Sequence, residues 1–275
     1  MRRSRFLPVG LVVVLAVAGL GACNPPAPRV QLTVNDAGFG VDDNPGDGRC
    51  RAPSASYRCT FPAAIQEANA FGAADIVVPA GVVYGPTSAP LAITVTGDVS
   101  ITGTGIPTSP TTGTTLAPYT LTVAAGAKLR MSSLLSYHFL APVRLVVAGR
   151  LDIQRAYIGA GQTSLDIRPG GSVIVSDSVV KLFSSTPTPS VPLGISGTLV
   201  LARSELRVAS LQISEGGTMV TSGSILDVDE CVAPPPVSSG DNRVKHESCA
   251  SKTTDTVGVP GTDLATWTQP GNSFV

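Results

Sequence analysis

One pattern occurs six times in the sequence: two alternating apolar residues, a short turn with a glycine, and two more alternating apolar residues. The turn glycines are Gly97, Gly126, Gly149, Gly171, Gly197 and Gly217, with spacings of 29, 23, 22, 26 and 20 residues by subtraction. Alternation with period two is typical of strands, and a repeat in the twenties indicates like strands stacked about 4.8 Å apart. The pattern therefore predicts an all-β fold, a parallel β-solenoid in which each repeat forms one coil.

Small residues recur at a fixed distance after the glycines and predict a narrow corner of each coil. They are Thr104, Ala156, Ser178, Ser204 and Ser224, each two residues before an apolar residue, and only the repeat with Leu134 and Ser136 departs from the rule. A leucine-rich repeat would need asparagines, which are absent from residue 70 to residue 241. An antiparallel sandwich would need Asn-Gly or Asp-Gly hairpin turns, which the repeats lack.

The first 22 residues have the features of an export signal. Arg2, Arg3 and Arg5 precede an apolar run from Phe6 to Leu20, which is short for a membrane span. The run ends in Leu20-Gly21-Ala22-Cys23, which resembles the lipobox of bacterial lipoproteins. The resemblance implies cleavage before Cys23 and lipid attachment to its thiol, whereas a plain secretory cleavage site and the export route both stay open.

Four further cysteines form two close pairs in sequence, and export would allow both pairs to oxidise. Three connectivities can be written, and we predict the local one, Cys50 with Cys59 and Cys231 with Cys249, because it closes two short loops. A zinc site is the competing hypothesis for four cysteines. Neither pair has tight metal-ligand spacing, and His138 and His246 are the only histidines.

One helix is expected ahead of the repeats, between Cys59 and Gly72. Thr60 can cap its start, Gly72 can end it, and an apolar stripe runs along it. The stripe consists of Phe61, Ala64, Ile65, Ala68 and Phe71. Because a solenoid must cover its terminal coil, we expect this helix to plug the N-terminal end.

The segments Leu32–Asp36, Asp43–Cys50 and Cys59–Ala70, followed by Asp75–Gly81 and Gly97–Gly105, resemble the N-terminal region of CSLREA-type bacterial surface proteins. That family has a pectin-lyase-like right-handed parallel β-helix, so the resemblance implies this fold and a cell-surface location. Pro62 stands where the family usually has arginine. Many relatives have no assigned activity, so the resemblance does not imply an enzyme.

These observations divide the chain into five predicted parts. They are a lipoprotein signal peptide (1–22), a tether (23–29), an N-terminal cap with the helix (30–74), the parallel β-helix (75–226) and a disulfide-closed C-terminal tail (227–275).

A basic face is the first candidate site. The repeat register places Lys128, Arg130 and Arg150 on adjacent coils, with Asp152 beside Arg130. Such a cluster could bind the carboxylates of an acidic polysaccharide. The alternative is a solvated ladder of surface ion pairs, each worth less than about 1 kcal/mol. Arg155, Asp177 and Arg203 form a second predicted ladder.

An acidic turn is the second candidate site. Asp42, Asp43, Asn44 and Asp47 resemble a calcium loop in composition, but their spacing differs from an EF-hand and no bidentate glutamate follows. The same residue types are ordinary turn formers, so a turn before Cys50 explains them as well.

Composition and the scattered acids limit the function. Lysine plus arginine equals aspartate plus glutamate at 19 each, so we expect no nucleic-acid partner. The acids between residues 91 and 226 share no register on neighbouring coils, whereas hydrolases and calcium-assisted lyases need converging carboxylates. The sequence therefore favours a non-catalytic envelope protein without a cofactor, held to the membrane by its lipid. An acidic-polysaccharide-binding module and an unusual polysaccharide lyase are the alternatives.

An apolar row on the later coils is a further expectation. Ile174, Val200 and Val220 replace the charges of the earlier coils at one outward register position. We expect the C-terminal tail with Trp267 to fold back onto this row, and a disordered tail is the alternative.

Overall fold

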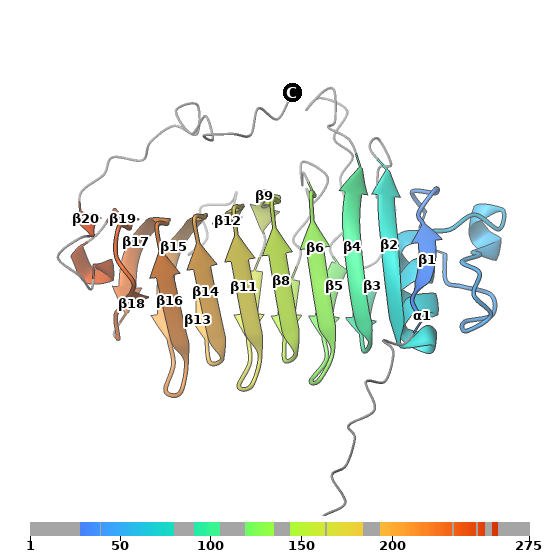
Figure 1. Cartoon of the computed structure of the whole chain (residues 1–275), viewed down its shortest axis with the longest axis horizontal. Coiled ribbons are helices and arrows are strands. Elements are labelled where there is room, and N and C mark those ends of the chain that lie inside the picture. The colour runs from blue at the N-terminus through green and yellow to red at the C-terminus, as the bar shows by residue number, and fades with distance from the viewer. Residues whose placement is uncertain are drawn as a thin grey trace, which may run out of the picture.

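The computed structural model describes residues 28–38, 40–79, 91–104, 119–134, 144–162, 164–183, 193–232, 234–245, 247–250 and 255–257. Within these ranges the protein consists of two parallel sheets, one α-helix and two disulfides, so the predicted parallel β architecture is confirmed at this level. The chain passes repeatedly from one sheet to the other, and both sheets extend along the long axis of the molecule (Figure 1).

The first sheet has nine strands in the spatial order β1-β2-β4-β6-β8-β11-β14-β16-β18. Its members are β1 (Val30–Thr33), β2 (Ala73–Pro79), β4 (Asp98–Thr104), β6 (Lys128–Ser132), β8 (Arg150–Gln154), β11 (Ser172–Ser176), β14 (Thr198–Ala202), β16 (Thr218–Ser222) and β18 (Val237–Ser238). All pair in parallel, so like positions of successive repeats form rows across the sheet.

The second sheet has eleven strands, nine of them in the order β20-β19-β17-β15-β13-β10-β7-β5-β3. They are β3 (Leu91–Val95), β5 (Tyr119–Val123), β7 (Arg144–Val147), β10 (Ser164–Ile167), β13 (Leu193–Ile195), β15 (Glu205–Ile213), β17 (Ile225–Val232), β19 (Arg243–Val244) and β20 (Thr256–Val257). The other two, β9 (Tyr157–Gln162) and β12 (Val179–Phe183), pair with each other, and β12 also pairs with the first half of β15.

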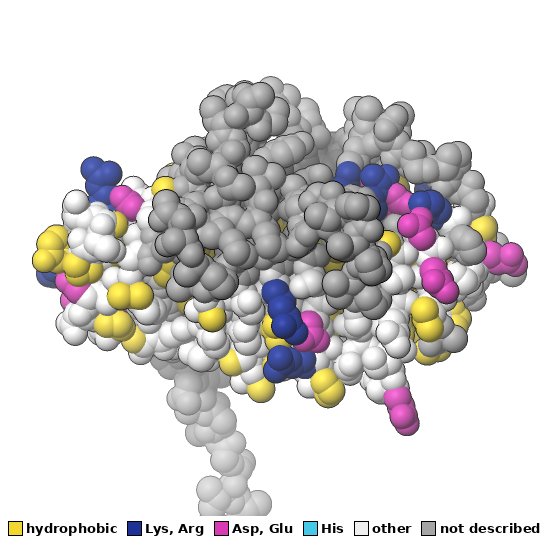
Figure 2. Space-filling view, turned by 180° about the vertical axis from the view of Figure 1, so that it is seen from behind, with side chains coloured by type: hydrophobic (Ala, Val, Ile, Leu, Met, Phe, Trp, Pro, Cys, Tyr) yellow, Lys and Arg dark blue, Asp and Glu magenta, His cyan; other side chains and the backbone are white. Residues whose placement is uncertain are grey.

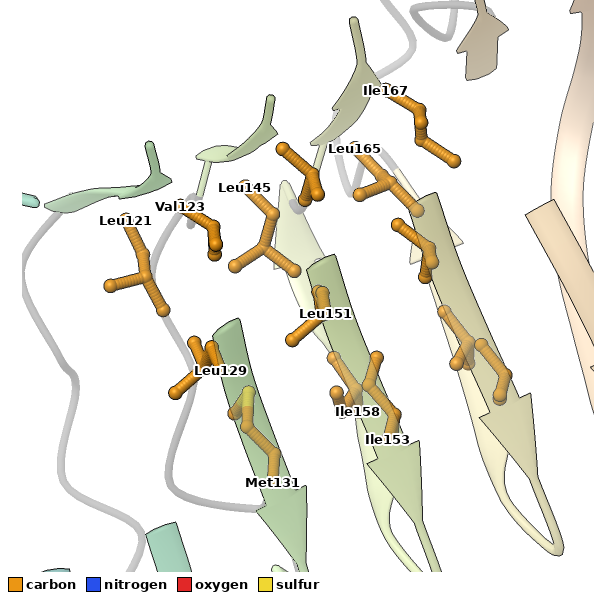
Figure 3. Packing of buried hydrophobic residues seen from close by; sticks show 14 of the residues in the cluster. Leu121, Val123, Leu129, Met131, Leu145, Leu151, Ile153, Ile158, Leu165 and Ile167 are labelled. Atoms are coloured by element: carbon orange, nitrogen blue, oxygen red, sulfur yellow. The ribbon is translucent and has the colours of Figure 1, made fainter. Parts of the chain in front are cut away.

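The core lies between the two sheets and is built from the apolar pairs of the repeat. Leu129, Leu151 and Leu199 are at most 1% exposed and lie in one row of the first sheet. Leu121, Leu145 and Leu165 form the matching row of the second sheet and point toward them (Figure 3). Each buried leucine contributes about 2 kcal/mol through the apolar surface it removes from water, so stacked aliphatic rows stabilise the fold along its length.

The glycine turns join the second sheet to the first, and we call the side of the molecule that carries them the glycine edge. At each turn a backbone amide bonds a carbonyl of the preceding turn, as from Ser172 N to Gly149 O (2.8 Å) and from Thr198 N to Gly171 O (2.9 Å). The turns lie along the lower side in Figure 1. Backbone packs directly on backbone here, which is why the repeat places glycine at this point.

The small residues of the repeat form a buried hydrogen-bonded ladder where the first-sheet strands end, which we call the ladder corner. Ala156 N donates to Ser178 Oγ (3.1 Å), Ser178 N to Ser204 Oγ (3.2 Å) and Ser204 N to Ser224 Oγ (3.3 Å). Each serine hydroxyl in turn donates to the carbonyl two residues before it. The ladder satisfies amide groups that the bend would otherwise leave buried without partners.

Helix α1 (Phe61–Phe71) covers the N-terminal end of the sheets, as predicted (Figure 1). Thr60 Oγ1 accepts from Ala63 N at its start, and Gly72 ends it with a left-handed φ of 80°. Ala64, Ile65 and Ala68 are at most 1% exposed, whereas Phe71 is 43% exposed. The predicted stripe therefore packs on the core through Ala68, and Phe71 lies beside Gly48 of the preceding loop.

Parallel pairing continues beyond residue 226, through β17, β18, β19 and β20. The disulfides are Cys50–Cys59 and Cys231–Cys249, with Cα–Cα distances of 4.9 and 5.3 Å, which confirms the predicted connectivity. Each should stabilise its end of the molecule by about 3 kcal/mol through loop closure.

The expected apolar row is present on the first sheet, where Ile174, Val200 and Val220 pair in register and Val237 extends the row. Val237 is 59% exposed. Trp267 and the rest of the tail beyond Val257 lie outside the described residues, so docking of the tail stays a prediction.

Candidate functional site

The predicted basic face lies on the outer side of the first sheet. Lys128 pairs with Asp98 on one side and Arg150 on the other. One step along the strands, Arg130 lies between Ser100 and Asp152 in register. The structure therefore brings Lys128, Arg130, Arg150 and Asp152 together on two neighbouring strands.

The ion pairs on this face differ from those that the register suggested. Arg130 Nη1 lies 3.1 Å from Asp98 Oδ1, one strand back, whereas Asp152 Oδ1 lies 2.8 Å from Nε of Arg150 in its own strand. The hydrogen bond to Asp152 raises the pKa of Arg150 above its ordinary value. Lys128 is exposed, and no ion pair joins it to another described residue.

Arg29 is a further member of this face, although the sequence pattern predicts that it belongs to the tether. Its Nε lies 2.8 Å from Asp75 Oδ1, its Nη1 lies 3.0 Å from Asp98 Oδ1, and its Nη2 donates to Ala74 O at 2.6 Å. A planar guanidinium with several donors suits such a bridge. Arg29 therefore fixes the start of β1 to the next two strands of the sheet.

The second predicted ladder lies at the ladder corner. Arg155, Asp177 and Arg203 have left-handed φ values of 49°, 49° and 48°. Arg203 donates to both carboxylate oxygens of Asp177, at 2.7 and 2.8 Å, and this hydrogen bonding lowers the pKa of Asp177. Since Arg203 is 67% exposed, the pair is a solvated one with a small effect on stability.

A charged cluster on the second sheet was not predicted. Lys181 pairs in register with Arg207, and Arg207 pairs with Asp227, to which it is also joined by an ion pair. Lys181 is 8% exposed and neighbouring Glu205 is 4% exposed. Burial raises the pKa of Glu205 and lowers that of Lys181, because a charge loses hydration there.

The sequence does carry a signal for this cluster. Lys181, Arg207 and Asp227 recur at the repeat spacing in the strand that follows the small residue. Extending the register past that residue would have placed them in one row. Lys245 continues the row with an ion pair to Asp227 at 3.2 Å.

The acidic turn is organised by Glu67 of α1. Glu67 is fully buried and accepts from the backbone amides of Gly46 (2.5 Å) and Gly48. Asp42 is 7% exposed, its Oδ1 accepts from Arg51 N at 2.6 Å, and burial together with the charge of Glu67 raises its pKa. These contacts build a turn against the helix.

The other members of the acidic turn take local roles. Asp47 Oδ1 accepts from Arg49 N at 2.8 Å, Asn44 is exposed, and Asp43 is exposed. In the part of the chain that the structure describes, no group of three or more His, Cys, Asp or Glu side chains could hold a metal ion.

Several predicted features lie outside the described residues: the signal peptide, Cys23, His138 and His246. Among the described residues, no helix is long and apolar enough to span a bilayer. Comparisons of the chain with protein-family models, curated proteins and solved structures find no match.

Proposed function

We propose that the chain is a lipid-anchored, non-catalytic protein of the bacterial cell envelope, a right-handed parallel β-helix of the CSLREA type that serves surface presentation or attachment. The export signal with Cys23 supports the anchor. Two parallel sheets with aligned repeats and a helix over the first coil support the β-helix.

The pairing of the acids carries the non-catalytic part of the proposal. Asp98, Asp152, Asp166 and Asp177 each lie within 3.4 Å of an arginine nitrogen. Glu205 lies 3.9 Å from Arg207. Carboxylates that each pair with one or two arginines act as ladder partners, whereas hydrolysis of a glycosidic bond needs two carboxylates facing one substrate.

Replacing Cys23 with serine tests the anchor. We expect the parent protein to sediment with membranes and to be cut by protease added to intact cells, and the C23S chain to leave the membrane fraction. Non-reducing electrophoresis of both chains checks that Cys50–Cys59 and Cys231–Cys249 form in each. Equal membrane retention of the two chains would contradict the lipid anchor.

Binding of an acidic polysaccharide is the second candidate function, favoured by the exposed cations of the first sheet. Arg130 and Arg150 are 47% and 51% exposed, and Lys128 adds a cation with no ion pair among the described residues. A polyuronate column should retain the parent chain, and Lys128→Gln with Arg130→Gln should weaken retention about tenfold. Arg155→Gln with Arg203→Gln removes the same charge elsewhere, so equal loss in both variants would exclude a site on this face.

The polysaccharide lyase is the weakest alternative, because no contact among the described residues favours it. We expect no unsaturated product from uronate polymers, with or without calcium.

A further inference from the structure

Exposed cations gather near the middle of the glycine edge, on the central strands of the first sheet. Lys128 and Arg150 are the first residues of β6 and β8, and Arg168 lies in the turn before β11. Arg150 and Arg168 are 51% and 55% exposed. Seen from behind, Lys and Arg side chains are visible near the middle of the lower edge in Figure 2. In the described turns of this edge, the one acidic residue is Glu215. It lies toward the C-terminal end of the edge, in the turn before β16.

These cations retain donors for a further ligand. Arg150 bonds Asp152 through Nε, at 2.8 and 3.1 Å, and Arg168 approaches Asp166 through Nε at 3.7 Å. Among the described residues, no hydrogen bond is made by the terminal guanidinium nitrogens of either side chain. The turn before Lys128 is Ala124-Ala125-Gly126-Ala127, which has no bulky side chain to hold a flat surface away.

Arg29 brings the N-terminal segment to the same edge. Val30 pairs with Ala74, and Ala73 pairs with Asp98, so Arg29 is level with the first residues of β4, β6 and β8. β6 and β8 are the third and fourth strands from β1. At a strand spacing of about 4.8 Å, Lys128 and Arg150 lie about 14 and 19 Å from Arg29 along the sheet.

The distance from Arg29 to the proposed lipid is bounded by chain length. Cys23 precedes Arg29 by six residues. Six residues span at most about 21 Å even when fully extended. An acylated Cys23 would therefore hold Arg29, and the edge on which it lies, within about 21 Å of the bilayer surface.

We propose that the glycine edge around Lys128, Arg150 and Arg168 binds the anionic headgroups of the bilayer that holds Cys23. This inference rests on the proposed lipid anchor. The anchor supplies a high local concentration of lipid, so a patch of modest affinity is sufficient. Anionic lipid fits better than a soluble polyanion, because Arg29 and the short tether direct this edge toward the membrane and the acid Glu215 lies at its far end.

Vesicle binding by residues 24–275 tests the edge without the acyl chains, since this segment contains every described strand and helix. We expect binding to vesicles of phosphatidylcholine with 30% phosphatidylglycerol, little binding to phosphatidylcholine alone, and weaker binding as salt rises. Each cation near an anionic surface changes the partition coefficient about fivefold. The triple variant Lys128→Gln, Arg150→Gln, Arg168→Gln should therefore bind about 100-fold more weakly.

The matched control removes three cations from the ladder corner, Arg155→Gln, Arg203→Gln and Arg243→Gln. This control should bind within about threefold of the parent, because Arg155 and Arg203 lie where first-sheet strands end and Arg243 begins β19 of the second sheet beside that corner. The glycine edge lies at the other end of the first-sheet strands, where they begin. Equal loss in the two triple variants, or no dependence on phosphatidylglycerol, would overturn the proposal. Binding to soluble polyuronate without binding to vesicles would also overturn it.

The vesicle test of the glycine edge can fail or succeed independently of the test of the lipid anchor. If Cys23 carries no lipid but the glycine edge still selects anionic vesicles, the anchor fails and the edge remains a membrane-binding surface. If Cys23 is acylated but the two triple variants behave alike, the anchor holds and this inference is wrong.

Discussion

Replacing Gly197 with alanine is expected to lower the free energy of unfolding by about 3 kcal/mol. A Cβ at this position would lie 2.3 Å from Gly171 O and 2.5 Å from Arg168 O. Both atoms belong to the backbone of the preceding glycine turn, which is held by the hydrogen bond from Thr198 N to Gly171 O. Neither atom can rotate away, so the alanine must push two stacked repeats apart.

Gly194→Ala is the matched control, three residues earlier in β13. A Cβ there meets nothing within 4 Å, so this change should leave stability within about 0.5 kcal/mol or raise it slightly. Urea unfolding of the three chains measures both effects. Equal stability of the Gly194 and Gly197 variants would show that the glycine turns do not pack as closely as the structure has them.

Replacing Asn242 with valine is expected to cost about 3 kcal/mol, because several buried polar groups lose their partner. Asn242 is 1% exposed, and its Oδ1 accepts from Ser224 N at 3.0 Å. Its Nδ2 donates to Ser238 Oγ at 2.8 Å and to Asp255 Oδ1 at 3.1 Å. The residue thus ends the serine ladder and joins it to the C-terminal closure.

Asn242→Ser distinguishes the loss of the ladder hydrogen bond from the loss of side-chain packing. A serine can accept from Ser224 N, as Ser204 and Ser224 do for the repeats before them. It should therefore recover about 1 kcal/mol and restore slow hydrogen exchange at Ser224 N. If the serine and valine variants unfold alike, with equal exchange at Ser224 N, the ladder does not act as described.

The repeats could be predicted from the sequence, because each position of the repeat has one steric or packing requirement that few residue types meet. Gly149, Gly171 and Gly197 stand where carbonyls of the preceding turn leave no room for a Cβ. Leu151, Val173 and Leu199 face the core, and period-two alternation reveals which side of a strand is buried. The same glycines set the register, so the repeat pattern alone places Lys128 and Arg150 side by side.

Contacts between segments outside the repeat could not be read in this way. Arg29 contacts Asp75 and Asp98, which are 46 and 69 residues away, and nothing in its local sequence indicates this. Glu67 looks like a polar residue on an ordinary helix, yet its carboxylate organises the acidic turn through Gly46 and Gly48.

The extent of the parallel pairing toward the C-terminus was hard to predict, because the residues that mark each repeat change there. Asn242 takes the place of the ladder serine, after the left-handed residue Asp241. The strands become too short to carry two alternating apolar residues, since β18 and β19 have two residues each. A search for a glycine flanked by two apolar pairs therefore ends earlier in the sequence than the parallel strand pairing does.

Mass spectrometry of the N-terminal peptide of the protein isolated from bacterial membranes tests the lipid anchor at the residue that would carry it. We expect the mature chain to begin at Cys23 and this residue to carry a diacylglyceryl group, and we expect the Cys23→Ser chain to lack that added mass. A mature chain that begins at another residue, or one with an unmodified Cys23, would contradict the lipid anchor.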